Sequence, residues 1–245
     1  MIEIIPVEGL PEIGEGDDLA ALIAAAAELR NGDVVVVAQK AVSKVEGRTV
    51  RLAEVEPSPR ARMLAGEETD LRQLEVILGE SARIVRTRHG LVIAETRHGF
   101  VCASAGVDHS NASEPDTVVL LPVDPDESAR RLRESLRERA GADVAVVVTD
   151  SFGRPFRRGT TDVAIGVAGL EPLRDLRGTP DRAGVPLRTT QVAVADELAA
   201  AANLVRYDKA DGLPVVIVRG ARVDQGDDES SARDLVMPAE RDLFR

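Results

Sequence analysis

The sequence predicts an α/β fold, or an α+β fold, built on a mixed sheet. Three apolar runs are rich in β-branched residues, as strands buried on both faces require: DVVVVAQK (33–40), DVAVVVTD (143–150) and LPVVIVRG (213–220). Segments with helical spacing lie between them, and the clearest is DPDESARRLRESLRERAG (124–141). Alternation of these two patterns is typical of a sheet with helices packed on it.

The first third of the chain predicts two strands and two helices. IEIIPV (2–7) is short and apolar, which indicates a strand. A helix should begin at the cap Asp17 and end at Gly32, and residues 33–40 should form the next strand. DLRQLEVILGES (70–81) favours a second helix with its leucines on one side.

In the middle of the chain, long helical patterns give way to short β-rich segments. Residues 82–121 are short β-rich pieces broken by glycine, which indicates a β-meander followed by the strand TVVLLP (117–122). In the helix at 124–141 we expect Asp124 to cap, Pro125 to lie in the first turn and Gly141 to end it. Its many arginines and glutamates are expected on a solvated face.

The last third predicts an alanine-rich helix over TTQVAVADELAAAANLV (189–205), packed closely by a neighbour because small residues lie on more than one face. A strand at 213–220 and one or two helical turns in residues 230–245 follow. We expect one domain over 1–245, with possible subdomains formed by 1–81 plus 187–245 and by 82–186.

Composition excludes several classes of function. The 245 residues carry a formal net charge of −11 and only 2% aromatic residues, so a general attraction to nucleic acid or anionic membrane is not expected. No apolar run reaches the roughly 20 residues of a membrane span, and the N-terminus lacks a basic leader. We therefore expect a cytoplasmic protein. The single cysteine, Cys102, allows no disulfide framework and is expected in the core.

Carboxylates that follow two strands are the candidate chemical groups. Asp108 comes after the small-residue segment FVCASAG, and Asp150 ends an apolar strand, with Ser151 beside it. Two such carboxylates could hold Mg²⁺ or Mn²⁺, and a cluster of arginines could neutralise phosphate: Arg154, Arg157 and Arg158. The alternative is that Asp150 and Ser151 make an ordinary turn or helix cap.

Two further polar segments remain open to two interpretations. QKAVSK (39–44) delivers Lys40, Ser43 and Lys44 after a buried strand, either as a phosphate site or as a short amphipathic helix with its lysines in solvent. In YDKADGLPVV (207–216), Asp208 and Asp211 are candidates, against an ordinary turn. No G-x-x-x-x-G-K-[ST] or H-E-x-x-H occurs, so neither a P-loop nor a zincin helix is expected.

Several blocks together resemble one family. GLPEIGEGDDLA (9–20), AQKAVSKVEGR (38–48), RHGFVCASAGVDHSN (97–111), TDSFGRPFRRGTTDVAIGVAGL (149–170) and ADELAAAANLV with ADGLPVVIVRG (195–220) occur in the order and spacing of the coenzyme F420:L-glutamate ligase family. The resemblance covers about Ile4 to Gly220. Longer members carry a nitroreductase-like domain after this one, and we expect the stand-alone form here.

The resemblance implies an enzyme and its co-substrates. Members of this family add L-glutamate to the side chain of the deazaflavin F420-0, and then γ-linked glutamate, while GTP becomes GDP and phosphate. The resemblance also implies two Mg²⁺ or Mn²⁺ ions, K⁺, a homodimer, and an α/β fold of the family's own type. An acyl-phosphate intermediate would activate the carboxylate. The alternatives are a related metal-dependent acyl or phosphoryl transferase and a non-catalytic nucleotide-binding domain.

The resemblance also carries roles to positions. Metal ligands would be Asp108, Asp150, Ser151 and Asp208, with Asp211 as a rival to Asp208. From the residues alone, the arginine cluster 154, 157 and 158 could face either the GTP phosphates or the acidic deazaflavin substrate, and we place it on the substrate side. The residues expected to meet GTP are Leu10, Pro11, Glu12, Ile13, Lys40, Ser43, Lys44, Asn111, Arg206, Tyr207, Lys209, Ala210, Asp211, Gly212 and Leu213.

Overall fold

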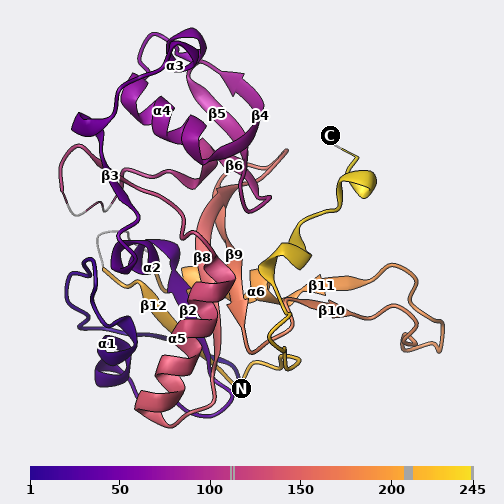
Figure 1. Cartoon of the computed structure of the whole chain (residues 1–245). Coiled ribbons are helices and arrows are strands. Elements are labelled where there is room, and N and C mark those ends of the chain that lie inside the picture. Colours follow the sequence, from indigo (N-terminus) through magenta and orange to yellow (C-terminus); the bar gives the residue numbers. More distant parts are fainter. Residues whose placement is uncertain (111, 113, 207–211, 244–245) are drawn as a thin grey trace.

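The fold centres on one mixed sheet. The computed structural model describes residues 1–110, 112, 114–206 and 212–243. Its five-stranded sheet has the order β1-β12-β2-β8-β9, in which β2 and β8 are parallel and the other neighbours are antiparallel (Figure 1). The strands are β1 (Glu3–Pro6), β12 (Val215–Arg219), β2 (Val34–Ala38), β8 (Ala145–Gly153) and β9 (Thr160–Ala168).

The valine runs form the middle of this sheet, as predicted. All four residues from Val34 to Val37 are fully buried, and so are those from Val146 to Val148. Consecutive strand residues point to opposite faces, so both faces must be covered. Helix α5 (Pro125–Ala140) packs on β8 and β9 with α1 (Leu19–Ala26) beside it, and α6 (Val194–Asn203) packs on β9, β8, β12 and β2.

A second, smaller core lies beside the main sheet, in the upper part of Figure 1. Helices α3 (Pro59–Leu64) and α4 (Leu71–Glu80) lie there with the meander β4 (Ser81–Arg88), β5 (Leu91–Thr96) and β6 (Val101–Ala103). The short pair β3 (Thr49–Arg51) and β7 (Thr117–Val119) connects this part to the main sheet. The core draws on residues before and after position 81, and the subdomain boundaries expected from the sequence stay a prediction.

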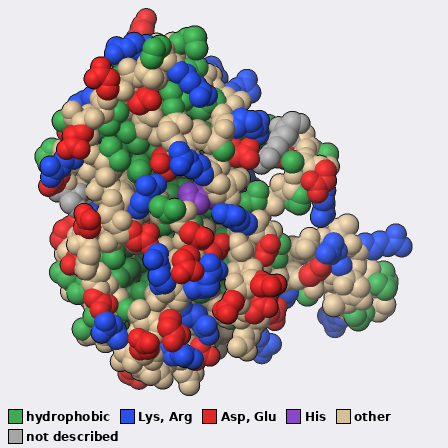
Figure 2. Space-filling view, viewed as in Figure 1, with side chains coloured by type: hydrophobic (Ala, Val, Ile, Leu, Met, Phe, Trp, Pro, Cys, Tyr) green, Lys and Arg blue, Asp and Glu red, His purple; other side chains and the backbone are tan. Residues whose placement is uncertain are grey.

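Helix α5 confirms its predicted signals. The Asp124 side chain accepts a hydrogen bond from the Glu127 amide at 3.0 Å, Pro125 is the first helical residue, and Gly141 is left-handed at φ +66°. Ion pairs such as Arg137–Glu134 cover the outer face, where charges of both signs are mixed (Figure 2). Exposed pairs of this kind contribute little stability, so the buried leucines hold the helix in place.

Two predicted helix boundaries are wrong. Asp18, not Asp17, caps α1 by accepting from the Ala21 amide, while the Asp17 carboxylate binds the Gly14 amide. The helix ends at Ala26 because Ala27 is extended, and this turn lets Leu29 enter the core. Gly32 instead serves a left-handed turn at φ +83° before β2.

The segment 189–205 is not helical throughout. Its first part forms β11 (Gln191–Ala193), which pairs with β10 (Leu173–Asp175) because the pairing satisfies backbone groups outside the main sheet. The two strands and their connection extend away from the body of the molecule (Figure 1). Helix α6 begins only at Val194, and its buried alanines allow the close packing that was expected.

The remaining elements complete the chain. Helix α2 (Gln39–Val45) follows β2 directly, and the 3-10 turns are η1 (Leu52–Glu54), η2 (Ser104–Gly106), η3 (Ala232–Leu235) and η4 (Ala239–Arg241). The last two agree with the predicted turns of the tail. Within the described parts of the chain, no helix has the length and apolar character to cross a membrane.

Substitution of Gly166 tests the packing of α5 on β9. A Cβ at this position would lie 2.3 Å from the Pro125 carbonyl oxygen, a backbone atom that cannot move without shifting the helix. Gly166→Ala should therefore cost about 1–3 kcal/mol of unfolding free energy, as overpacking does in cores. Gly153→Ala is the matched control, because no atom lies within 4 Å of the added Cβ. Equal thermal midpoints for the two variants would contradict this packing.

Candidate active site

A pocket of about 530 Å³ lies past the carboxyl end of β2, where its parallel pairing with β8 stops at Thr149. This edge is where open α/β sheets bind their ligands. The wall is made by residues 38–41 after β2, residues 149–151 of β8, and the loop residues 11–13. Asp108, Asp162, Asn203 and Arg206 enter from four other segments, and residues 212–214 complete the lining.

Asp108 is tied to Lys40 on one side of the pocket. The Lys40 ammonium lies 2.7 Å from Asp108 Oδ2 and donates to the Ser110 carbonyl at 2.7 Å. The Ser110 amide and hydroxyl also donate to the Asp108 carboxylate. Although burial alone would raise the pKa of Asp108, these hydrogen bonds and the Lys40 charge lower it below its ordinary value. Asp108 is therefore an anion at neutral pH.

Asp150 binds its proton more tightly than Asp108 does. Burial raises its pKa to about 7, and the negative charges of Asp108 and Asp162 add to the rise, while the Ser151 amide and Lys40 oppose it. The predicted position of Asp150 at a strand end is wrong, because β8 continues to Gly153 through its antiparallel pairing with β9. Only the buried part of the strand stops near Asp150. Two neighbouring carboxylates thus differ in their affinity for a proton.

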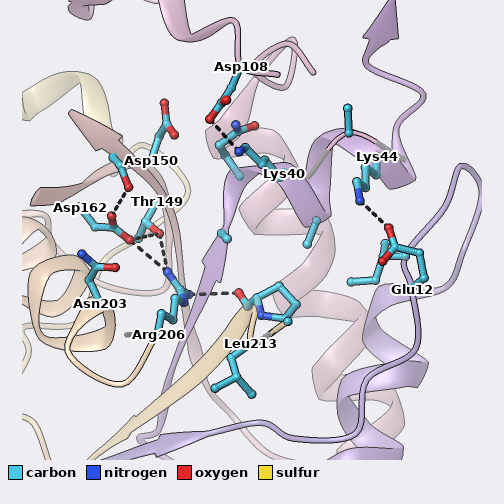
Figure 3. A pocket seen from close by; sticks show the side chains of 18 of the residues that line it. Glu12, Lys40, Lys44, Asp108, Thr149, Asp150, Asp162, Asn203, Arg206 and Leu213 are labelled. Carbon is cyan, nitrogen blue, oxygen red and sulfur yellow. Dashed lines mark hydrogen bonds and ion pairs between the residues drawn. The ribbon is translucent and has the colours of Figure 1, made fainter. Parts of the chain in front are cut away.

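A buried ion pair lies at the back of the pocket. Arg206 Nη1 lies 3.2 Å from Asp162 Oδ2 and donates to Thr149 Oγ1 at 3.0 Å, while Nη2 donates to the carbonyls of Val36 and Pro214 (Figure 3). Burial lowers the pKa of Arg206 to about 10, which still leaves it charged at neutral pH. The Ser151 hydroxyl donates to the other oxygen of Asp162 at 2.6 Å.

The QKAVSK segment is a helix, but its lysines are not in open solvent. Lys44 is mostly buried, and its ammonium lies 2.6 Å from the carboxylate of the exposed Glu12 (Figure 3). Ser43 is fully buried and donates to Gln39 Oε1 at 2.9 Å. Among the described residues, Gln39 Nε2 has no hydrogen-bond partner. Helix α2 thus points Lys40 and Lys44 at the pocket and turns Ser43 away.

Most of the predicted residues that the structure describes meet at this pocket. Pro11, Glu12, Ile13, Lys40, Lys44, Asp108, Asp150, Ser151, Arg206, Gly212 and Leu213 all line it. Leu10 packs against the main core instead, and Ser43 is behind the wall. Arg154, Arg157 and Arg158 lie in the β8–β9 turn and do not line the pocket, so their substrate role stays a prediction. The predicted Asn111, Tyr207, Asp208, Lys209, Ala210 and Asp211 lie outside the described residues.

Sequence reasoning missed several residues of the pocket. Among them are the polar residues Asp162, Thr149 and Asn203, which line the pocket but were not proposed as site residues. Asp162 could have been found only by predicting the β8–β9 hairpin, because that pairing brings Asp162 opposite Ser151. A turn at GRPFRRG between two β-rich segments would have suggested that pairing.

The donor atoms of the pocket are hard oxygens, the kind that Mg²⁺ and Mn²⁺ prefer. Asp108 and Asp150 supply two carboxylates. Burial is the main cause of the raised pKa of Asp150, and a cation would relieve the repulsion from Asp108 that adds to it. Within the described residues, no three His, Cys, Asp or Glu side chains gather as a metal cluster. The pocket therefore fits Mg²⁺ or Mn²⁺ in the chemical type of its oxygen atoms, which come from two carboxylates and a neighbouring hydroxyl.

The fold and the pocket define a class: an α/β protein without a P-loop motif, with a pocket that acidic and basic side chains line together. Residues 9–220 match the family model described as F420-0:Gamma-glutamyl ligase. The chain belongs to this F420-0:γ-glutamyl ligase family, which confirms the resemblance seen in the sequence and the expected α/β fold.

Curated relatives match the chain over nearly their whole length. A protein of Methanothermobacter thermautotrophicus named "Coenzyme F420:L-glutamate ligase" is 46% identical, over 100% of this chain and 99% of its own. A protein of Methanopyrus kandleri with the same name is 48% identical, over 100% and 97%. One from Halobacterium salinarum is 49% identical over 87% of this chain and 85% of its own.

Removal of Arg206 should destabilise the fold strongly. Arg206→Ala leaves Asp162 buried without its partner, and breaking a buried pair in this way costs about 3–5 kcal/mol. Arg157→Ala, at an exposed position of the β8–β9 turn, should change stability by less than about 0.5 kcal/mol. Urea unfolding of both variants measures the difference. Similar midpoints would show that the Arg206 guanidinium does not hold the pocket together.

Replacement of Asp150 should change stability in a pH-dependent way. Folding raises its pKa from 3.8 to about 7, so ionisation opposes folding increasingly from pH 4 to pH 7 and fully above that. In EDTA, Asp150→Asn should stabilise the protein by roughly 2–4 kcal/mol at pH 8 and by little at pH 4. The exposed Asp228→Asn serves as control. An equal effect of Asp150→Asn at both pH values would contradict the pKa of Asp150.

Proposed function

We propose that this protein is a ligase that joins L-glutamate to the side chain of coenzyme F420-0. The observation that carries the proposal is the full-length match, at 46% and 48% identity, to proteins named "Coenzyme F420:L-glutamate ligase". The pocket supports it, because carboxylates and lysines converge at one sheet edge, as phosphoryl chemistry requires.

The proposed reaction uses GTP as the source of activation. A carboxylate oxygen of F420-0 attacks the γ-phosphorus of GTP, the bond to the β-phosphate oxygen breaks, and GDP leaves. The glutamate amine then attacks the acyl carbon, the amide bond forms, phosphate leaves, and one proton is released. A second γ-linked glutamate follows by the same steps. The γ-carboxylate of the first glutamate is then the group that is activated.

Side chains of the pocket divide this work. Lys40 and Lys44, which α2 presents to the pocket, would meet phosphate oxygens, and Lys44 would exchange the exposed Glu12 carboxylate for the nucleotide. Asp108 and Asp150 would hold Mg²⁺ or Mn²⁺, with the Ser151 hydroxyl as a further oxygen ligand. When bound, such cations neutralise the charge that develops on the transferred phosphoryl group.

Further parts of the proposal rest on the resemblance. They are a second divalent ion with Asp208 among its ligands, stimulation by K⁺, a homodimer and a cytoplasmic location. Metal analysis, a K⁺ titration of activity and light scattering of the purified protein test the first three in turn. A monomer in light scattering would remove the homodimer from the proposal.

Phosphate release tests the proposed reaction against its alternatives. Purified protein with GTP and Mg²⁺ should release phosphate and form a glutamylated product only when F420-0 and L-glutamate are both present. GTP binding without turnover would favour a non-catalytic nucleotide-binding domain. Turnover with another phosphorylated carboxylate, and not with F420-0, would favour a related transferase. Positional isotope exchange within GTP, without glutamate, tests the acyl-phosphate step.

Substitution of the two pocket carboxylates should remove activity. Asp108→Asn and Asp150→Asn keep the side-chain shape but remove the negative charge that holds a cation, so each should lower kcat by about 100-fold or more. Asp228→Asn, in an exposed turn, should retain full activity. Ligation is followed by mass spectrometry of the product. Activity within twofold of the unsubstituted protein in both pocket variants would exclude this site.

A further inference from the structure

The hydroxyl of Ser151 has only lone pairs left for the pocket. Ser151 lines the pocket, and its Oγ donates its one hydrogen to Asp162 Oδ1 at 2.6 Å. A serine hydroxyl has one hydrogen to donate and two lone pairs to accept with. Because the hydrogen is already used, a ligand that reaches Ser151 meets an acceptor and cannot receive a hydrogen bond from it.

The Ser151 hydroxyl cannot easily turn its hydrogen away from Asp162, because the rest of the fold holds that carboxylate in place. The Asp162 side chain is buried, and Arg206 Nη1 lies 3.2 Å from Oδ2 (Figure 3). Arg206 is fixed in turn by the carbonyls of Val36 and Pro214. The β8–β9 register places Ser151 directly opposite Asp162, so the two side chains face each other on paired strands.

We propose that Asp162 is a positioning residue that fixes the Ser151 hydroxyl as a lone-pair donor for an electropositive centre in the pocket. This inference rests on the proposed function and deepens it. The centre is a divalent cation or the ammonium group of an amino-acid substrate, since both take lone pairs. A phosphate oxygen is excluded at this point, because it would need the hydrogen that Ser151 already donates to Asp162.

Binding to the full chain tests the proposal without turnover. Mn²⁺ is titrated into metal-free protein and the free ion is followed by electron paramagnetic resonance, while L-glutamate is titrated separately by calorimetry. Asp162→Asn and Ser151→Ala should each lower the affinity for either Mn²⁺ or L-glutamate by about 10–100-fold. Removal of a residue that orients a metal ligand usually has an effect of this size. Weaker Mn²⁺ binding identifies the cation, and weaker glutamate binding identifies the ammonium group.

The double variant separates positioning from a general loss of structure. If Asp162 acts through Ser151, adding Asp162→Asn to Ser151→Ala should weaken binding no further. Ser151→Thr keeps the hydroxyl and should bind within about threefold of the unsubstituted protein. Losses that multiply in the double variant would overturn the proposal. Unchanged binding of both Mn²⁺ and glutamate in Ser151→Ala would also overturn it.

Two controls keep the outcome clear. Asp162→Asn weakens the buried pair with Arg206, so its thermal midpoint is measured first. If it does not fold, the comparison of Ser151→Ala with Ser151→Thr decides, because both leave that pair intact. Ligation by the unsubstituted protein is assayed separately. If the protein does not ligate but the variants lower Mn²⁺ affinity as expected, only the proposed function is refuted. If ligation is normal but the affinity losses multiply in the double variant, only the role of Asp162 is refuted.

Discussion

The pocket depends on one buried charge, the guanidinium of Arg206. A charge away from water is stable only when its hydrogen bonds and a counter-charge are supplied. The two Nη atoms of Arg206 obtain them from carbonyls next to β12 and within β2, from the Thr149 hydroxyl of β8 and from the Asp162 carboxylate of β9. Four strands are thereby joined at the edge where the pocket opens. The side chain therefore acts as an internal support of the site.

The carboxylates of the pocket differ in whether a cationic side chain pairs with them. Asp162 is neutralised by Arg206, and Asp108 by Lys40, whereas Asp150 lies among these carboxylates and has a raised pKa. A site that retains uncompensated negative charge attracts a cation. The lysines of α2 lie on the same wall, so acidic and basic side chains face the same small pocket.

The elements were predictable where local signals agree. The valine runs and the capped helix α5 follow from burial and capping, which act within a few residues. The residue pattern also singled out Lys40, Lys44, Asp108, Asp150 and Ser151, which all line the pocket, and the resemblance assigned their roles. Asp162 was missed because the segment TTDVAIGVA predicts a strand and nothing more. Its carboxylate binds Ser151 and Arg206, which lie 11 and 44 positions away in the sequence.

The sequence by itself determined the α/β class, the family and which acidic and basic residues could do chemistry, because these depend on composition, short-range pattern and ordered motifs. Only the tertiary structure decided which of those side chains share a pocket. It turned Ser43 toward Gln39, engaged Arg206 inside the protein and extended β8 beyond Asp150. The reason is physical: buried polar groups must find partners, and strand pairing brings those partners from distant parts of the chain.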